Sequence, residues 1–216
     1  MNKIVLLLVF CVSTSVFCQN LQLHHDFERE HFTTTFELFK MDKYGNTFTF
    51  IDFDYNAENG INQGYFEIAR VLKTEKIPVG LHVEYNGGVG MTPNFGYSIN
   101  AAWIFGVNYS KGTANWGFST YAGYKSFKNA GEANYQITGT WYWHLLNSKL
   151  TLTGFADVWT ENGDGLSGTT VFLAEPQVWY NLNKTFSIGG EVELSNNFAY
   201  TPEFKVRPTL GIKWNI

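Results

Sequence analysis

The sequence predicts an all-β fold, a transmembrane antiparallel up-and-down β-barrel of about twelve strands. Three observations support this prediction. Apolar and polar residues alternate with a period of two along most of the chain, and the alternation continues to the last residue. Aromatic residues make up 18% of the chain although its mean hydropathy is only -0.16. Strands with one face in lipid and the other in a polar lumen have this composition.

The clearest strand is Val206–Ile216. Its apolar positions are Val206, Pro208, Leu210, Ile212, Trp214 and Ile216, and the residues between them are polar or glycine. A helix would place such a pattern on all of its sides, whereas a strand separates it into two faces. The stretch 169–182 alternates in the same way, with Phe172, Val178 and Tyr180 against Glu175, Gln177 and Trp179.

The N-terminal residues predict a signal peptide over 1–18. Lys3 supplies a positive charge, Ile4–Phe10 is apolar, and this apolar run is too short to span a bilayer. We expect cleavage after Cys18, which leaves residues 19–216 as a single outer-membrane β-barrel domain. The alternative is lipidation of Cys18, which Phe17 disfavours because that pathway prefers a small residue there. Cleavage removes both cysteines, so the mature chain would have no disulfide and no thiol chemistry.

The alternating runs predict strands of about ten residues, the length that a tilted strand needs to cross a bilayer. The expected spans are 21–28, 31–40, 47–55, 64–74, 78–86, 96–109, 115–128, 132–146, 149–160, 169–182, 185–195 and 204–216. An even number places both termini on the periplasmic side. The longer connections are then outside, at 56–63, 87–95, 161–168 and 196–203. Pro176 and Pro208 fall inside strands, where we expect a bulge or a local break.

A soluble secreted barrel is the alternative fold, since its strands also alternate. Its apolar face would point inward. The bulk of Tyr135, Trp141 and Trp143 on one face of a single strand argues against that packing. We therefore expect a barrel in the outer membrane of a Gram-negative bacterium, with membrane lipid and the barrel-assembly machinery as partners.

Several segments, in the same order, resemble the nucleoside-specific outer-membrane channel family, the Tsx-like porins. They are Phe36–Lys40, Phe50–Asp54, Gly64–Arg70, Tyr121–Lys125, Asn129–Glu132 with Tyr135, and Gly154–Asp157 with Trp159. Each motif is weak by itself, and the shared order over most of the mature chain carries the resemblance. The resemblance implies a monomeric twelve-stranded barrel whose narrow lumen admits nucleosides. The chain departs from the family in being shorter and in ending at Ile216, where an assembly signal usually has an aromatic residue.

Charged residues within strands are expected to face the lumen, because Lys or Arg at the bilayer midplane costs about 2–4 kcal/mol. The lumen or substrate candidates are Asp52, Asp54, Glu67, Arg70, His82, Glu84, Lys125, Tyr142, His144, Asp157, Glu175, Trp179, Glu191 and Glu193. Acids predominate among them. Acids that accept hydrogen bonds from ribose, with Tyr142 and Trp179 stacking on a base, would favour nucleosides over nucleotides. Phe48 and Phe50 share the face of Asp52 and would extend the stacking surface unless a bulge swaps their face. The alternative is that acids and bases pair across the lumen and only fill it.

The sequence thus predicts an outer-membrane channel for passive diffusion of small solutes, with nucleosides as the favoured cargo and without cofactors. His24, Asp26 and Glu28 share a face, but no further residue completes a metal site, so we expect none. The net charge of -4 argues against a nucleic-acid partner. Two other functions stay open. One is a structural or adhesive barrel without transport, and the other is a lipid-modifying barrel enzyme. We expect no enzyme, because His82 and His144 would point away from lipid.

Overall fold

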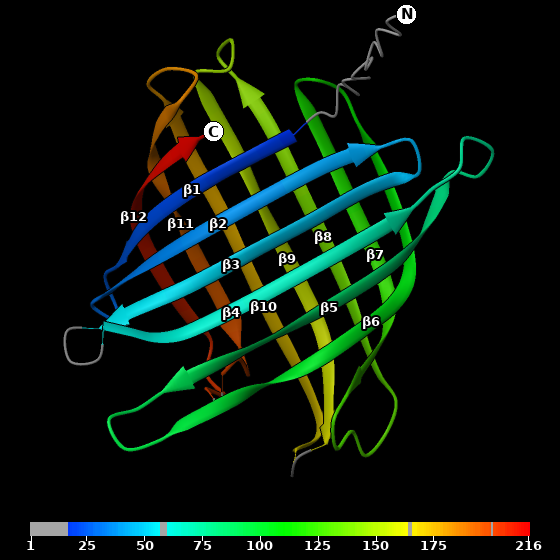
Figure 1. Cartoon of the computed structure of the whole chain (residues 1–216), viewed down its shortest axis with the longest axis vertical. Coiled ribbons are helices and arrows are strands. Elements are labelled where there is room, and N and C mark those ends of the chain that lie inside the picture. Colours follow the sequence, from blue (N-terminus) through cyan, green and yellow to red (C-terminus); the bar gives the residue numbers. More distant parts are fainter. Residues whose placement is uncertain (1–16, 57–59, 164–165, 200) are drawn as a thin grey trace, which may run out of the picture.

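The computed structural model describes residues 17–56, 60–163, 166–199 and 201–216. Within these residues the chain forms one closed antiparallel β-barrel of twelve strands (Figure 1), so the predicted fold class is confirmed. None of the described residues is helical. The predicted signal peptide lies outside the described residues except for Phe17 and Cys18, with which the first strand begins.

Each strand pairs with its neighbours in the chain, and the first pairs with the last. The strands are β1 (Phe17–Asp26), β2 (His31–Asp42), β3 (Gly45–Asn56), β4 (Gly60–Leu72), β5 (Val79–Met91), β6 (Gly96–Gly112), β7 (Trp116–Phe127), β8 (Asn134–Leu145), β9 (Leu150–Gly163), β10 (Leu166–Asn181), β11 (Phe186–Asn196) and β12 (Lys205–Asn215). The β1–β12 ladder runs from Asn20–Asn215 to Asp26–Thr209. Closure gives every strand two partners, which satisfies backbone groups where no water is available.

No helix among the described residues is long and apolar enough to cross a bilayer.

The strands extend further than expected at the end of the barrel opposite the termini. Gly87–Met91 belongs to β5 and Gly60–Gln63 to β4, so long loops predicted at these positions were wrong. The glycines there are strand residues that permit close cross-strand contact. A Cβ on Gly90 would lie 2.2 Å from the ring of its partner Tyr97, so the aromatic ring covers the glycine.

The two strand prolines interrupt pairing locally, as expected. Pro176 pairs with β9, whereas the β10–β11 pairing is interrupted at Glu175 and Pro176 without a change of register. The β11–β12 pairing is interrupted next to Pro208. There the backbone N–H of Glu191 donates to Thr209 Oγ1 at 3.1 Å, and this side chain replaces a missing ladder acceptor.

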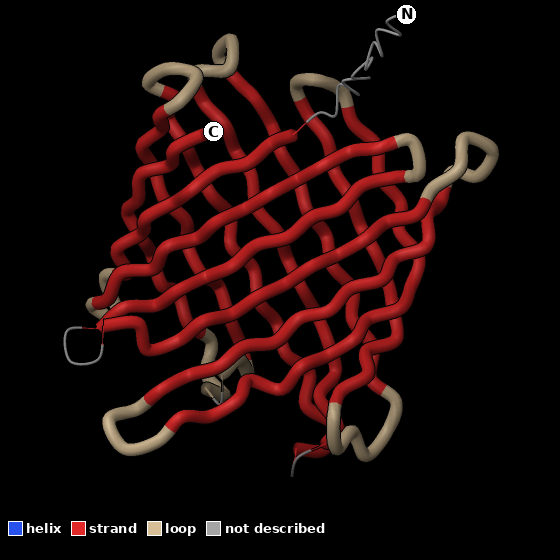
Figure 2. Tube along the Cα trace, viewed as in Figure 1, coloured by secondary structure: helices blue, strands red, loops and turns tan. Residues whose placement is uncertain are grey.

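The two faces of the barrel wall have the polarity of a membrane protein. The strands run obliquely around the barrel (Figure 2), and large apolar side chains such as Leu81 and Ile137 are exposed on the outside. Polar side chains are buried inside, with His24 and Glu84 each only 1% exposed. This distribution is the reverse of that in a soluble barrel, so the soluble alternative is wrong.

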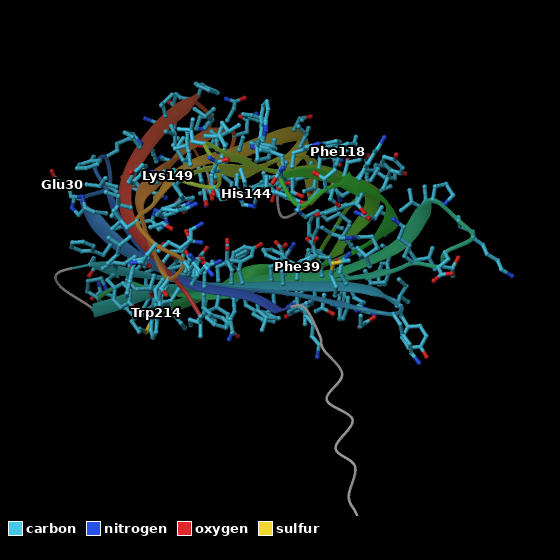
Figure 3. The ribbon with its side chains drawn as sticks, turned by 90° about the horizontal axis from the view of Figure 1, so that it is seen from above. Glu30, Phe39, Phe118, His144, Lys149 and Trp214 are labelled. Atoms are coloured by element: carbon cyan, nitrogen blue, oxygen red, sulfur yellow. The ribbon has the colours of Figure 1, made fainter. Side chains whose placement is uncertain are left out.

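The barrel is flattened when it is seen from the end that holds the C-terminus, which we call the terminal end (Figure 3). The early strands form one broad wall, the later strands form the other, and side chains fill much of the space between them. Phe39 and His144 lie on the facing inner sides of these walls, whereas Trp214 lies outside. Trp214 stacks on Phe186 with ring centroids 6.4 Å apart, next to the β10–β11 turn, as expected for aromatic residues at a membrane interface.

Candidate functional site in the barrel lumen

The register shows which residues point inward, because directly paired residues of antiparallel strands share a face. Gln22, which is buried, pairs with Thr35, Thr35 with Asp52, and Asp52 with Tyr65. The same reasoning continued around the barrel assigns a face to each described strand residue. The inner face so defined contains most of the charged residues of the strands.

All the predicted lumen residues except Arg70 point inward. The inward set is Asp52, Asp54, Glu67, His82, Glu84, Lys125, Tyr142, His144, Asp157, Glu175, Trp179, Glu191 and Glu193. Phe48 and Phe50 also point inward, because the β2–β3 register is continuous and no bulge swaps their face.

Arg70 was wrongly assigned to the lumen. It pairs with Thr47 and Val83 on the outer face of the barrel, close to the terminal end. Its guanidinium donates to Asp42 Oδ1 at 2.9 Å and to Thr47 Oγ1 at 3.0 Å. A long cationic side chain near the end of a strand reaches the bilayer interface and avoids the cost that applies at midplane.

Water-accessible space in the lumen lies between the two broad walls. The inward side chains of β2–β4, such as Thr35, Phe50 and Glu67, are half-buried, and so are Phe155 and Glu175 on the opposite wall. By contrast, the inward residues at the two edges of the flattened barrel are almost fully buried; they include Asn20, Gln22, His24, His82, Glu84 and Asn86. A solute would therefore contact the broad walls rather than the filled edges.

Several carboxylates face this space from both walls, and we call five of them the central carboxylates. They are Asp52 and Glu67 on β3 and β4, and Asp157, Glu175 and Glu191 on β9, β10 and β11. Glu67 interacts electrostatically with Asp157, and Asp52 with Glu191, so the two walls are close enough for their charges to act on one another. Neutral donors hold two of these acids, Thr35 Oγ1 at 2.5 Å from Asp52 and Gln177 Nε2 at 2.8 Å from Glu191.

Three aromatic rings, which we call the aromatic ladder, lie beside the carboxylates on the β3–β4 wall. The ring centroids of Phe48 and Phe50 are 6.0 Å apart, and those of Phe50 and Tyr65 are 5.9 Å apart. All three rings are half-buried, so a planar solute can reach them. Aromatic faces next to carboxylates suit a solute that combines a flat ring with hydroxyl groups.

Trp179 does not provide the stacking surface that was expected of it, whereas the inward-facing Tyr142 is 37% exposed and its stacking role stays a prediction. Trp179 is 1% exposed; Lys213 Nζ lies 4.1 Å from its ring centroid, and its indole donates to Gln177 Oε1 at 2.8 Å. The ring of Tyr142 lies against Gly117, where a Cβ would be 2.5 Å from it, and its hydroxyl donates to a backbone carbonyl. Trp179 therefore fills the wall, while Tyr142 is only partly covered by Gly117.

One filled edge is built around His82 and Tyr121, whose rings stack with centroids 3.7 Å apart. The Tyr121 hydroxyl accepts a hydrogen bond from Gln136 Nε2 at 2.9 Å, and Gln136 Oε1 accepts one from Lys125 Nζ at 3.1 Å. His82 Nε2 lies 3.0 Å from Glu84 Oε2. This network links buried polar groups of this edge and closes that side of the lumen, while His82 Nδ1 is buried without a hydrogen-bond partner among the described residues.

The other filled edge contains His24. Its Nε2 lies 2.9 Å from Gln22 Oε1, its Nδ1 lies 2.9 Å from Thr209 Oγ1, and Glu191 is 3.7 Å away. These contacts occupy the ring nitrogens of a histidine that the sequence had placed beside Asp26 as an incomplete metal site. Within the described residues, no group of three or more His, Cys, Asp or Glu side chains is arranged to hold a metal ion.

A cluster of ion pairs lies at the end opposite the termini. Arg207 Nη1 is 2.5 Å from Glu193 Oε1, and Arg29, from the β1–β2 turn, donates to Glu193 Oε2 at 2.9 Å and to Asp26 Oδ2 at 2.6 Å. Burial acts against the charge on Arg29, but Glu193 and Asp26 outweigh it and raise the pKa of the guanidinium further. The ends of β1, β11 and β12 and the β1–β2 turn are thereby tied together on one side of this mouth.

Several inward residues were missed in the sequence. Arg207 and Lys213 lie at inward positions of β12, and Tyr65 and Tyr121 supply inward rings. The alternation of the strands could have identified them, because each lies an even number of positions from other inward residues of its own strand.

The sequence of residues 18–216 matches a protein family described as "Domain of unknown function (DUF5020)". The chain belongs to the DUF5020 family. No curated protein matches it.

Solved structures similar to this DUF5020 barrel include porins. A NanC porin matches with a TM-score of 0.60 and 10% identity, over 92% of this chain and 100% of the other. A KdgM porin matches with a TM-score of 0.56 and 10% identity, over 93% and 99%. A second KdgM structure, in complex with disordered oligogalacturonate, matches with a TM-score of 0.55 and 9% identity, again over 93% and 99%. At these identities the likeness concerns the fold, that of a transmembrane porin barrel.

Proposed function

We propose that this DUF5020 protein is an outer-membrane channel for the passive diffusion of small solutes. The fold supports the proposal, because the similar barrels are porins. In the orientation that we propose, the terminal end faces the periplasm. The observation that carries the proposal is the half-buried space between the two broad walls, which is lined by charged and aromatic side chains rather than by a packed apolar core.

The central carboxylates define the charge of the solutes that pass. Rings of acidic side chains favour cations and neutral molecules over anions. Lys125 is the cation that acts on Glu67, while Arg29 and Lys213 act on Glu191 from the edges. The KdgM structure mentioned above holds oligogalacturonate, which is a polyanion. Such a solute would be repelled by the acids in this lumen, so we expect a different cargo.

Nucleosides are the favoured cargo. A nucleoside is uncharged, has a flat base for the rings of Phe48, Phe50 and Tyr65, and has ribose hydroxyls that can donate to Asp52 or Glu67. A nucleotide adds a phosphate that the carboxylates disfavour. The resemblance of the sequence to nucleoside-specific channels supports the same cargo.

Nucleoside uptake into proteoliposomes tests this proposal. Stacking on one aromatic ring contributes about 1–3 kcal/mol per base. Phe50→Ala should therefore raise the adenosine concentration at which uptake is half-maximal by at least about fivefold. Phe53→Ala is the matched control, because Phe53 lies on the same strand with its ring exposed on the outer face. Equal loss in both variants, or adenosine uptake that does not saturate, would overturn the nucleoside assignment while leaving a general pore.

A structural barrel without transport is the second candidate function. The nearly complete burial of His24, Glu84 and their neighbours at the edges favours it, since side chains can fill a small barrel. Two described turns at the end opposite the termini are short and offer little surface for adhesion, namely the β1–β2 turn at 27–30 and the β5–β6 turn at 92–95. Correctly folded protein that transports no solute in the same proteoliposomes would support this second candidate.

A further inference from the structure

The outer face carries a basic cluster that the sequence does not reveal, because its members are far apart in the chain. Two neighbouring turns at the terminal end, β2–β3 and β4–β5, are joined by a 2.7 Å hydrogen bond from the backbone N–H of Lys73 to the carbonyl of Tyr44. The cationic residues in these turns and at the adjoining strand ends form what we call the basic rim: Lys40, Lys43, Arg70, Lys73 and Lys76. Asp42 and Glu75 are the acids of the same segments, so five positive charges face two negative ones in a chain whose net charge is -4.

An outer groove of about 510 Å³ begins at this rim. Arg70, Lys73 and Tyr44 form its polar end. Its remaining wall is largely apolar and exposed, formed chiefly by Leu72, Ile77, Val79, Leu81 and Val107. The Arg70 guanidinium stays at the rim through Asp42 and Thr47, and Lys43 Nζ lies 4.7 Å from the Tyr44 ring centroid.

The apolar side of the groove continues into a second depression of about 420 Å³ across β6, β7 and β8. Val107 lines both, so the two adjoin. The small residues Gly106, Ala122 and Gly123 form the floor of this depression, and Phe105 and Tyr124 stand beside it. A charged end, an aromatic residue at the interface and a long apolar trough together match one glycerophospholipid, with its phosphate at the rim and an acyl chain along the trough.

We propose that this groove is a specific site for an anionic glycerophospholipid. The headgroup phosphate lies between Arg70 and Lys73, with Tyr44 beside it. The rim carries net positive charge after Asp42 and Glu75 are counted, and this excess selects an anionic headgroup over a zwitterionic one. The choice of a phospholipid over a glycolipid rests on the proposed orientation, in which the terminal end faces the phospholipid leaflet.

Native mass spectrometry of the full chain tests the site. The detergent-purified protein is mixed with equal amounts of phosphatidylglycerol, phosphatidylcholine and a lipid A glycolipid, and the retained lipids are compared. Wild-type protein should retain phosphatidylglycerol preferentially. In the double variant Arg70→Gln with Lys73→Gln, the ratio of retained phosphatidylglycerol to retained phosphatidylcholine should fall about thirtyfold. Each cation near an anionic lipid contributes roughly a factor of five to this ratio.

The matched control is Lys149→Gln with Lys184→Gln, which removes the same charge from two other turns at the terminal end. It should leave the preference unchanged. A second double variant, Lys73→Gln with Lys76→Gln, changes two residues of the β4–β5 turn, outside the strands. It should reduce the preference for phosphatidylglycerol and still fold, and circular dichroism checks the folding. Equal retention of both lipids by wild type, an equal drop in the control, or preferential retention of a lipid A glycolipid over phosphatidylglycerol would overturn the proposal. Solute transport is not measured, so the result is independent of the channel function.

Discussion

Neutralising central carboxylates on both walls should reduce the preference of the channel for cations. Glu67 and Glu191 are suitable because they lie on β4 and β11, in the two facing walls of the barrel, and substitution by Gln keeps their size while removing their charge. An ion about 7 Å from a carboxylate interacts with it by about 0.6 kcal/mol in water, and screening at 0.1 M salt halves this to about 0.3 kcal/mol.

The effect on selectivity follows from that interaction. Each carboxylate attracts a cation and repels an anion by similar amounts, so removing two changes the difference by about 1.2 kcal/mol, or about sevenfold. The assay is the reversal potential across a planar bilayer with a potassium chloride gradient. The control is Glu30→Gln with Glu75→Gln, which removes the same charge from two turns. An unchanged reversal potential for the luminal variant, or an equal shift for the control, would refute this reasoning.

Two further changes should affect stability, measured by urea unfolding in detergent. Arg207→Gln removes a partner of the buried Glu193 and should lower the free energy of unfolding by about 1–3 kcal/mol, and Arg207→Lys should recover part of this loss. A loss no larger than that caused by substituting an exposed lysine would contradict the ion pair. Gly189→Ala should cost about 1–3 kcal/mol, since its Cβ would lie 1.9 Å from the backbone oxygen of Val178, whereas Gly139→Ala has open space and should be neutral. Equal stability of the two alanine variants would show that the backbones do not approach as closely as described.

The strands could be predicted because alternation reports a physical requirement at every position. One face must be apolar to contact lipid and the other must be polar, so alternation together with the cost of charge in lipid placed Glu175, Glu191 and His144 in the lumen. The N-terminal signal and its cleavage after Cys18 stay predictions, as does the role of the assembly machinery.

Three errors show where sequence reasoning stopped. Arg70 was assigned inward by the cost of charge at midplane, but that cost does not apply to a residue near the end of its strand. Gly87–Met91 has the composition of a loop, yet cross-strand pairing and the Tyr97 ring keep it in β5. Trp179 faces inward as predicted, but Lys213, which covers it, lies on β12, two strands away, and alternation within one strand does not describe such a contact.

The most direct measurement of the proposed function is the single-channel current of the refolded wild-type protein in a planar bilayer. Adenosine is titrated first, and an adenine nucleotide follows. A nucleoside channel lined by the central carboxylates predicts small cation-favouring current steps that adenosine blocks and the nucleotide does not. A correctly folded barrel that carries no current, or one that favours anions, would contradict it.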